Sequence, residues 1–190
     1  MTTVKTIQRR DRWADAAVIG LVIVALAVGL LLRNGVLSRT VAFTADTITG
    51  AYPVDWIRES SENHLLRVHD PRGGEFNTVL ELYSRPLAAE AEVAMVLDAL
   101  AMERVGQVSN YRTLETDQVA LDGNTATRRL FTYVYVDPNP FVDRLPVVVQ
   151  GMDLALRDGG RVIVATLLAE ADEFDAQQGR FLDFVQSLEF

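Results

Sequence analysis

The sequence predicts an α+β protein: a single N-terminal transmembrane helix followed by an antiparallel β-sheet flanked by helices. Three observations predict it. Residues 16–32 contain no polar or charged side chain. Several later segments alternate apolar and polar residues between glycine-containing turns, which is typical of hairpins. Two further segments place apolar residues at helical spacing, so helices are expected against the sheet.

The apolar run is long enough for a membrane anchor. At the helical rise it spans roughly 26 Å, against roughly 30 Å for the hydrocarbon core of a bilayer. Four basic residues precede it, namely Lys5, Arg9, Arg10 and Arg12. The positive-inside rule therefore places the N-terminus in the cytoplasm and the rest of the chain outside.

This topology divides the chain into four segments. We expect a cytoplasmic segment (residues 1–13), a transmembrane helix (14–33), a tether (34–50) and an extracytoplasmic α+β domain (51–190) in the cell membrane. A cleaved signal peptide, with cleavage after Ala27-Val28-Gly29, is the alternative. An uncleaved anchor is favoured because the apolar run continues through Leu32.

The first half of the outer domain is expected to hold short strands and one helix. Residues 52–57 predict a turn that enters a strand, and residues 64–70 a strand closed by the turn at 70–74. Residues 76–83 alternate as a third strand. Residues 86–105 then predict a helix, with Ser84 as a possible N-cap and Gly106 as its stop.

The second half is expected to hold two hairpins and a closing helix. One hairpin joins residues 111–121 to 125–136 around Asp122-Gly123, and the other joins 147–156 to 161–168 around residues 158–160. A last helix capped by Asp172 places four apolar residues on one face, namely Phe174, Phe181, Val185 and Leu188.

Three stretches of the outer domain resemble a known family. They are Tyr52-Pro53-Val54-Asp55-Trp56, the hairpin sequence at residues 119–126, and the terminal residues 181–188. On these motifs, residues 50–190 resemble the PsbP/Mog1-like α/β/α sandwich superfamily. The resemblance implies an α/β/α sandwich and a non-catalytic accessory or binding role.

Composition excludes several kinds of chemistry. The chain has no cysteine, which excludes disulfides, thiol catalysis and cysteine-ligated metal centres. Residues 33–190 carry 14 arginines and 24 acidic residues. This acidic balance repels phosphate backbones, so no nucleic-acid partner is expected.

The motifs of catalysis and cofactor binding are also missing. There is no nucleophile elbow, P-loop, dinucleotide fingerprint or HExxH sequence. His64 and His69 are five residues apart and would point to opposite faces of a strand, as surface or turn histidines rather than metal ligands. We therefore expect no catalytic residue, no cofactor and no metal. A Ser-His-Asp triad needs no fixed spacing, so a hydrolase stays open.

Five residues are candidates for contact with partners. The pairs Ala16/Gly20 and Ala25/Gly29 have the small-xxx-small spacing that lets two transmembrane helices approach closely. Phe141 lies in a proline-containing loop, where it either forms a contact surface or packs back against the sheet.

The favoured function is a non-catalytic accessory subunit of a larger membrane protein complex. Its partners would be other membrane subunits and the lipid bilayer. The alternatives are a stand-alone membrane-anchored module that binds a lipid, peptide or metal ion, and a hydrolase of unrecognised type.

Overall fold

The computed structural model describes residues 18–29, 39–61, 63–121, 123–139, 141 and 145–190. The chain divides into two units, Met1–Thr40 and Val41–Phe190. In the first unit, residues 18–29 form a helix on which every residue is exposed. None of the helices in the described part of the chain is long and apolar enough to cross a membrane. The rest of the expected transmembrane helix, residues 14–17 and 30–33, lies outside the described residues, as do residues 1–13.

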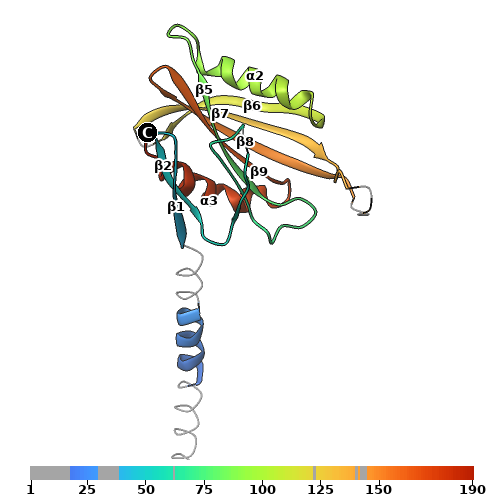
Figure 1. Cartoon of the computed structure of the whole chain (residues 1–190). Helices are drawn as coiled ribbons and strands as arrows, with labels where there is room; N and C mark the ends of the chain where they lie inside the picture. The colour runs from blue at the N-terminus through green and yellow to red at the C-terminus, as the bar shows by residue number, and fades with distance from the viewer. Residues whose placement is uncertain (1–17, 30–38, 62, 122, 140, 142–144) are drawn as a thin grey trace, which may run out of the picture. The chain divides into compact units, whose positions relative to one another are not determined.

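The second unit is built on one antiparallel sheet of seven strands (Figure 1). Their order across the sheet is β3-β4-β5-β9-β8-β7-β6. The strands are β3 (Ile57–Arg58), β4 (Leu66–His69), β5 (Val79–Pro86), β6 (Ser109–Leu121), β7 (Asn124–Tyr135), β8 (Val147–Asp158) and β9 (Arg161–Glu170).

One helix covers each face of this sheet. Figure 1 shows α2 (Val93–Val105) above the sheet and α3 (Phe174–Gln186) below it. Because successive side chains of a strand point to opposite faces, residues 162–169 of β9 contribute to both layers and are all buried. α3 buries Phe174, Phe181 and Phe184 on the lower layer. The predicted antiparallel sheet with flanking helices is confirmed.

Both predicted hairpins are present. β6 pairs with β7 up to Leu121↔Asn124, and β8 pairs with β9 up to Asp158↔Arg161. Gly123 has φ +84° and Gly159 has φ +56°, values that glycine adopts without steric cost. The glycine-containing turns in the sequence therefore predicted these two connections correctly.

The start of α2 differs from the prediction. Residues 84–86 are not the first turn of a helix but the end of β5, paired with β9 through Pro86↔Arg161. Ser84 therefore caps nothing, and α2 begins at Val93 after Glu92. Strand pairing outweighed the local helix signal because it gives the backbone of these residues its hydrogen bonds.

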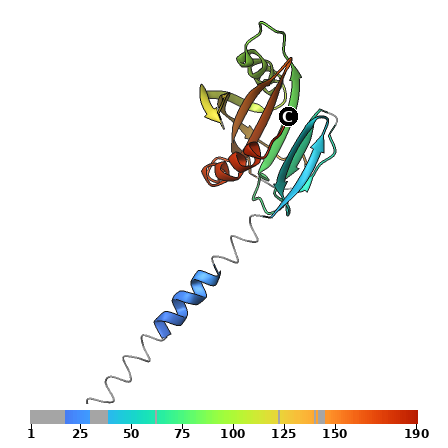
Figure 2. The same ribbon diagram turned by 90° about the vertical axis from the view of Figure 1, so that its left-hand side faces the viewer.

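The range expected as a tether also differs. β1 (Thr40–Ala45) and β2 (Ile48–Pro53) form a two-stranded sheet, seen on the right in Figure 2. Phe43 and Ile48 are buried in the α3 layer, and the Phe43 and Phe184 rings stack with centroids 6.2 Å apart. Residues 41–50 thus belong to the second unit, because a hydrophobic contact with a helix far along the chain orders them.

Candidate functional site

The surface of α2 is the most unusual feature of the domain. Among its residues only Asp98, Glu103 and Arg104 are polar. Its inner side packs on the sheet through a buried set of residues, Val96, Leu97 and Leu100. Its outer side leaves Met95 61%, Met102 79% and Val105 61% exposed. Large apolar side chains thus remain exposed on the outer side of α2, beside the exposed carboxylates of Asp98 and Glu103.

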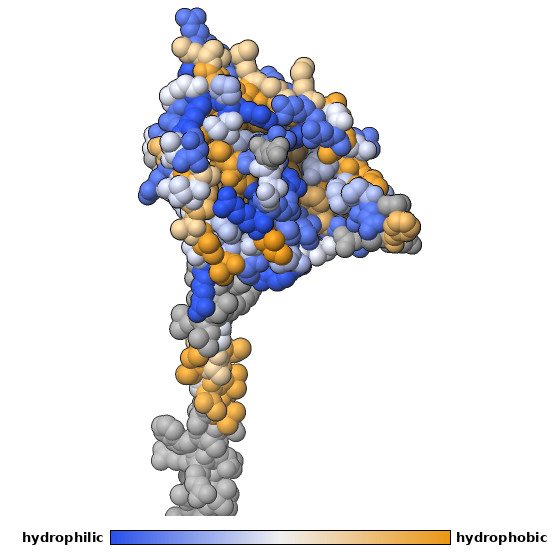
Figure 3. Space-filling view, in the orientation of Figure 1, coloured by the Kyte–Doolittle hydropathy of each residue, from blue (hydrophilic) through white to orange (hydrophobic). Residues whose placement is uncertain are grey.

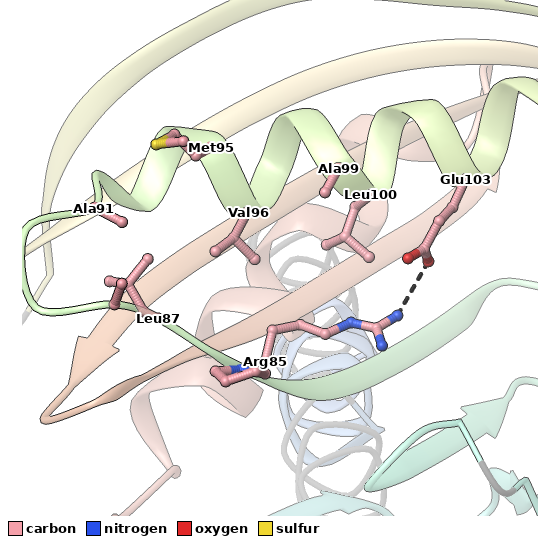
Figure 4. Close-up of a pocket in the computed structure, with 10 residues that line it drawn as sticks. Arg85, Leu87, Ala91, Met95, Val96, Ala99, Leu100 and Glu103 are labelled. Atoms are coloured by element: carbon pink, nitrogen blue, oxygen red, sulfur yellow. Dashed lines mark hydrogen bonds and ion pairs between the residues drawn. The ribbon is translucent and has the colours of Figure 1, made fainter.

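A groove of about 300 Å³ runs between α2 and residues 85–91 (Figure 4). We call it the α2 groove. Figure 4 shows Leu87 and Val96 lining it from the two sides, with the Arg85–Glu103 ion pair at one end. Its lining is Arg85, Pro86, Leu87, Ala88, Ala91, Met95, Val96, Ala99, Leu100 and Glu103.

The outer wall of the α2 groove is held in place by the β8–β9 hairpin. The Leu87 amide donates to the carbonyl of Gly160 at 2.8 Å. The Arg157 guanidinium donates to the carbonyls of Ala89, at 2.7 Å, and Ala88, at 3.3 Å. These bonds hold the segment at 87–89 against the hairpin, so the groove is part of the folded domain.

A buried ion pair lies beneath the C-terminal end of α2. Arg104 binds Asp153 of β8 through two hydrogen bonds, of 2.6 and 2.9 Å. Thr166 of β9 donates to Asp153 at 2.6 Å, and the Arg104 guanidinium lies 4.4 Å from the centroid of the Phe131 ring. Burial by itself would lower the pKa of Arg104, but Asp153 outweighs it and raises this pKa above its ordinary value. Arg104 therefore stays charged and ties α2 to the sheet.

A chain of polar groups continues from this pair across the same face. Arg67 donates to Glu81, whose side chain is 4% exposed. The Tyr83 hydroxyl donates to the second oxygen of Glu81 at 2.5 Å, and the hydroxyl oxygen lies 3.0 Å from His64 Nε2. Ser61 Oγ lies 2.6 Å from His64 Nδ1. These distances fit a neutral His64 that donates to Tyr83 and accepts from Ser61.

A recess of about 270 Å³ opens between Arg104 on one side and the polar chain of Glu81, Tyr83 and His64 on the other. Aromatic residues form one wall: the Phe76 and Tyr135 rings meet edge to face with centroids 5.0 Å apart, and Tyr133 lies beside them. Burial and the nearby Glu81 raise the pKa of Tyr133, so its hydroxyl stays protonated. The recess thus offers aromatic surface beside a neutral hydroxyl.

We predict that His64 makes stability depend on pH. Burial lowers the pKa of His64 below its ordinary 6.5, and Glu81 offsets this only in part. The unfolded chain then binds more protons than the folded one as the pH falls below about 6.5, so the free energy of unfolding decreases with falling pH. Urea unfolding from pH 7.5 to 5 should show a smaller slope against pH for His64→Gln than for wild type. Equal slopes would contradict the prediction.

The two histidines are less exposed than the surface position expected of them. Their side chains are only 15% and 17% exposed, and His69 Nδ1 lies 2.7 Å from Glu59. His69 is paired with Val79 in the sheet, whereas His64 lies in the irregular segment before β4, where its ring contacts Ser61 and Tyr83. In the described ranges no group of three metal-ligating side chains comes together.

Four of the five residues that are candidates for partner contact lie among the described residues. The Phe141 ring is 94% exposed, so it does not pack back against the sheet. A Cβ added at Gly20 or Gly29 would meet no atom within 4 Å. Ala25 is exposed, and Ala16 lies outside the described residues. Contact of these residues with partners stays a prediction.

Comparisons with known proteins show which known fold this chain resembles. No protein-family model and no curated protein matches the sequence. The solution structure of cyanobacterial PsbP (CyanoP) from Synechocystis matches 80% of this chain and 91% of its own, with TM-score 0.55 and 12% identity. The chain has a PsbP/Mog1-like fold.

Two other solved structures are similar at lower scores. The Ran-binding protein Mog1p of Saccharomyces cerevisiae matches at TM-score 0.48 and 13% identity, covering 80% of this chain and 95% of its own. LpqN of Mycobacterium tuberculosis, a protein involved in cell envelope biogenesis, matches at TM-score 0.47 and 14% identity, covering 79% and 89%. Likeness at such identities concerns the fold, whereas function depends on the sites that each chain carries.

The residues that shape this face are not among the site residues expected from the sequence. Glu81 and Asp153 each stand between apolar neighbours in a strand. A charge within a strand that is buried on both faces needs a partner, and this was the available signal. For Met95 and Met102, the available signal was a helical segment in which only Asp98, Glu103 and Arg104 are polar.

Proposed function

We propose that this chain is a non-catalytic accessory subunit of a membrane protein complex, with its domain outside the cytoplasm. One observation supports the proposed membrane anchor. Residues 18–29 form a helix whose residues are all apolar and all exposed. Because the apolar run continues over residues 16–32, a bilayer is the environment that such a surface fits.

The uncovered side of α2 supports the subunit role. Met95, Met102 and Val105 are large apolar residues whose exposure to water is unfavourable. Apolar surface of this kind, bordered by polar residues, is typical of protein–protein contacts. Phe141 adds a second exposed apolar group.

We expect the full chain to stay in the membrane pellet after carbonate extraction. A double variant, Ile23→Arg with Leu26→Arg, should release it, because each arginine at the centre of a membrane helix costs about 2.5–3.5 kcal/mol. Phe141→Arg is the control, since it places the same charge outside the apolar run. Release of the wild-type chain would contradict the anchor.

The subunit role is tested by extraction of the tagged chain in gentle detergent, followed by a native gel and mass spectrometry. We expect a stoichiometric assembly with other membrane proteins. Protease added outside the cell should digest residues 51–190 and spare the N-terminal segment. A chain that runs alone as a monomer or homodimer would overturn the proposal.

The recess supports the alternative of a stand-alone binding module. Its aromatic wall of Phe76, Tyr133 and Tyr135 would suit the apolar side of a small ligand. A chain that runs alone in the native gel and binds a peptide or lipid in this recess would favour that alternative. Tyr133→Ala should then weaken binding, because it removes one ring of the wall.

The hydrolase alternative rests on Ser61 and His64. Their 2.6 Å contact has the hydrogen-bond length that a nucleophile–base pair of a serine hydrolase requires. A fluorophosphonate probe labels such activated serines, and we expect no labelling of the full chain. Labelling that disappears in Ser61→Ala but persists in Ser60→Ala would show a reactive serine and overturn the non-catalytic role.

A further inference from the structure

We propose that the recess lined by Phe76, Tyr133 and Tyr135 binds a small uncharged molecule that carries a carbonyl group on an aromatic ring. This inference goes beyond the accessory role and does not depend on it. Four features carry it: the size of the recess, its aromatic wall, a hydroxyl group without a partner, and the pairing of the charges around it.

The recess has the size and the apolar wall of a small-molecule site. Its volume of about 270 Å³ is close to the lower end of the range for ligand pockets, roughly 300–1,000 Å³. The Phe76 ring meets the Tyr133 and Tyr135 rings edge to face, with centroids 6.5 and 5.0 Å apart. A flat ring of a ligand can pack against these rings in the same offset or edge-to-face manner.

The Tyr133 hydroxyl supplies a hydrogen-bond donor that the protein does not use. Tyr133 is 6% exposed, and no group in the described part of the chain forms a hydrogen bond with its hydroxyl. The charges of Glu81, Arg104 and Arg67 act on this hydroxyl, and all three residues line the recess, so the hydroxyl faces it. A ligand that fills the recess would cut the hydroxyl off from water, and it must therefore bring an acceptor.

The acceptors around the recess are already engaged. Glu81 accepts from Arg67 at one oxygen and from Tyr83 at the other, and both oxygens of Asp153 accept from Arg104. Arginine can only donate, and neither Arg67 Nη2 nor Arg104 Nε forms a hydrogen bond within the described residues. The polar side of the recess thus has more donors than acceptors to offer, which suits a carbonyl oxygen.

The pairing of charges disfavours a ligand with a net charge. Arg67 is balanced by Glu59 and Glu81, and Arg104 is balanced by Asp153. An anion would find no unpaired cation here and would bring its charge close to Glu81. A cation would meet the N–H groups of two arginines. Because a charge without a counter-ion costs far more to desolvate than a carbonyl group, an uncharged ligand is favoured.

The recess therefore combines two kinds of wall. Hydrophobic and hydrophilic residues lie side by side on the face of the domain drawn in Figure 3, and the recess joins both kinds within one small volume. Its aromatic wall takes the ring of the ligand, and its donors take the carbonyl oxygen.

The first test compares three flat probes of nearly the same shape and different charge: benzamide, benzoate and benzamidinium. Each is titrated into the full chain in phosphatidylcholine nanodiscs, and binding is followed by saturation-transfer NMR with empty nanodiscs as the blank. We expect benzamide to bind with a Kd of about 1–10 mM, the range for so small a ligand. The charged probes should bind at least about tenfold more weakly.

Three outcomes would contradict this expectation. Benzoate that binds as tightly as benzamide would show that the arginines form an anion site. Benzamidinium that binds as tightly would show that the aromatic rings and Glu81 form a cation site. No binding of benzamide at ~10 mM would show that the recess is not a site for this class of ligand. Each of these results would overturn the proposal.

The second test removes one hydroxyl group at a time. Tyr133→Phe keeps the ring and removes the donor, so benzamide should bind about three- to tenfold more weakly. Tyr111→Phe is the matched control: the Tyr111 hydroxyl is also buried without a hydrogen-bond partner among the described residues, but Tyr111 is not part of the lining of the recess. Its loss should leave the affinity unchanged.

A change in folding would not explain this pattern. Neither of the two hydroxyls is hydrogen-bonded within the described residues, so both variants should be at least as stable to urea as the wild type. Equal affinities of the wild type and Tyr133→Phe would overturn the proposal, and so would an equal loss in Tyr111→Phe.

The recess proposal and the accessory role fail in different ways. If the chain extracts alone but binds benzamide through Tyr133, the accessory role fails and the recess proposal stands. If the chain extracts in an assembly and benzamide does not bind, only the recess proposal fails.

Discussion

Asp153→Ala should lower the free energy of unfolding by about 3–5 kcal/mol, the usual cost of removing one partner from a buried ion pair. The Asp153 side chain is fully buried and holds both Arg104 and Thr166. Its removal leaves the Arg104 charge, 13% exposed, without its counter-ion. Urea unfolding followed by the fluorescence of the buried Trp56 would measure the change.

A matched control exists on the neighbouring hairpin. Asp117 and Arg128 also form two hydrogen bonds, of 2.9 and 2.7 Å, but their side chains are 35% and 29% exposed. Asp117→Ala should therefore cost at most about 1 kcal/mol. A double variant, Arg104→Met with Asp153→Leu, should recover much of the stability lost in Asp153→Ala, because no unpaired charge remains. Equal costs for the two aspartate variants would show that burial does not govern these pairs.

Gly151→Ala should destabilise the domain by about 1–3 kcal/mol, the usual cost of overpacking a core. A Cβ at this position would lie 2.2 Å from Cζ of the Phe131 ring. That ring is fully buried and stacks on Tyr111 with centroids 5.3 Å apart, and Arg104 lies against it. The ring cannot move aside, so the strand itself must shift. Urea or thermal unfolding would detect the loss.

Gly179→Ala is the control for Gly151→Ala and should have the opposite sign. Gly179 lies within α3, and nothing is within 4 Å of its added Cβ. Alanine is favoured over glycine inside a helix by about 0.8–1 kcal/mol, so stability should rise. If Gly151→Ala were as harmless as Gly179→Ala, the close approach of β8 to Phe131 would be wrong.

The local sequence determined those parts of the fold that neighbouring residues control. Asp-Gly and Gly-Gly turns between alternating segments identified the two hairpins, because glycine permits the positive φ at Gly123 and Gly159. The spacing of Phe174, Phe181 and Val185 identified the packed face of α3. The order of these elements was enough to predict the sheet and its two helices.

Tertiary contacts decided what local sequence leaves open. Residues 84–86 have a sequence that is compatible with the start of a helix, yet pairing with β9 keeps them in β5. The segment at 40–53 has too short an alternation to predict a hairpin, and burial of Phe43 and Ile48 against α3 orders it. In both cases the deciding contact comes from residues far along the chain, which no local window of sequence contains.

The candidate site shows the same division. The sequence by itself predicted a helix that stops at Gly106 and strands over 76–83 and 147–156, which contain Glu81 and Asp153. Only the tertiary structure decided that Arg67 and Arg104 are their partners, and that one side of α2 stays uncovered. Ion pairs and exposed surfaces depend on how distant elements pack, because a charge is stabilised by whatever group the fold places beside it.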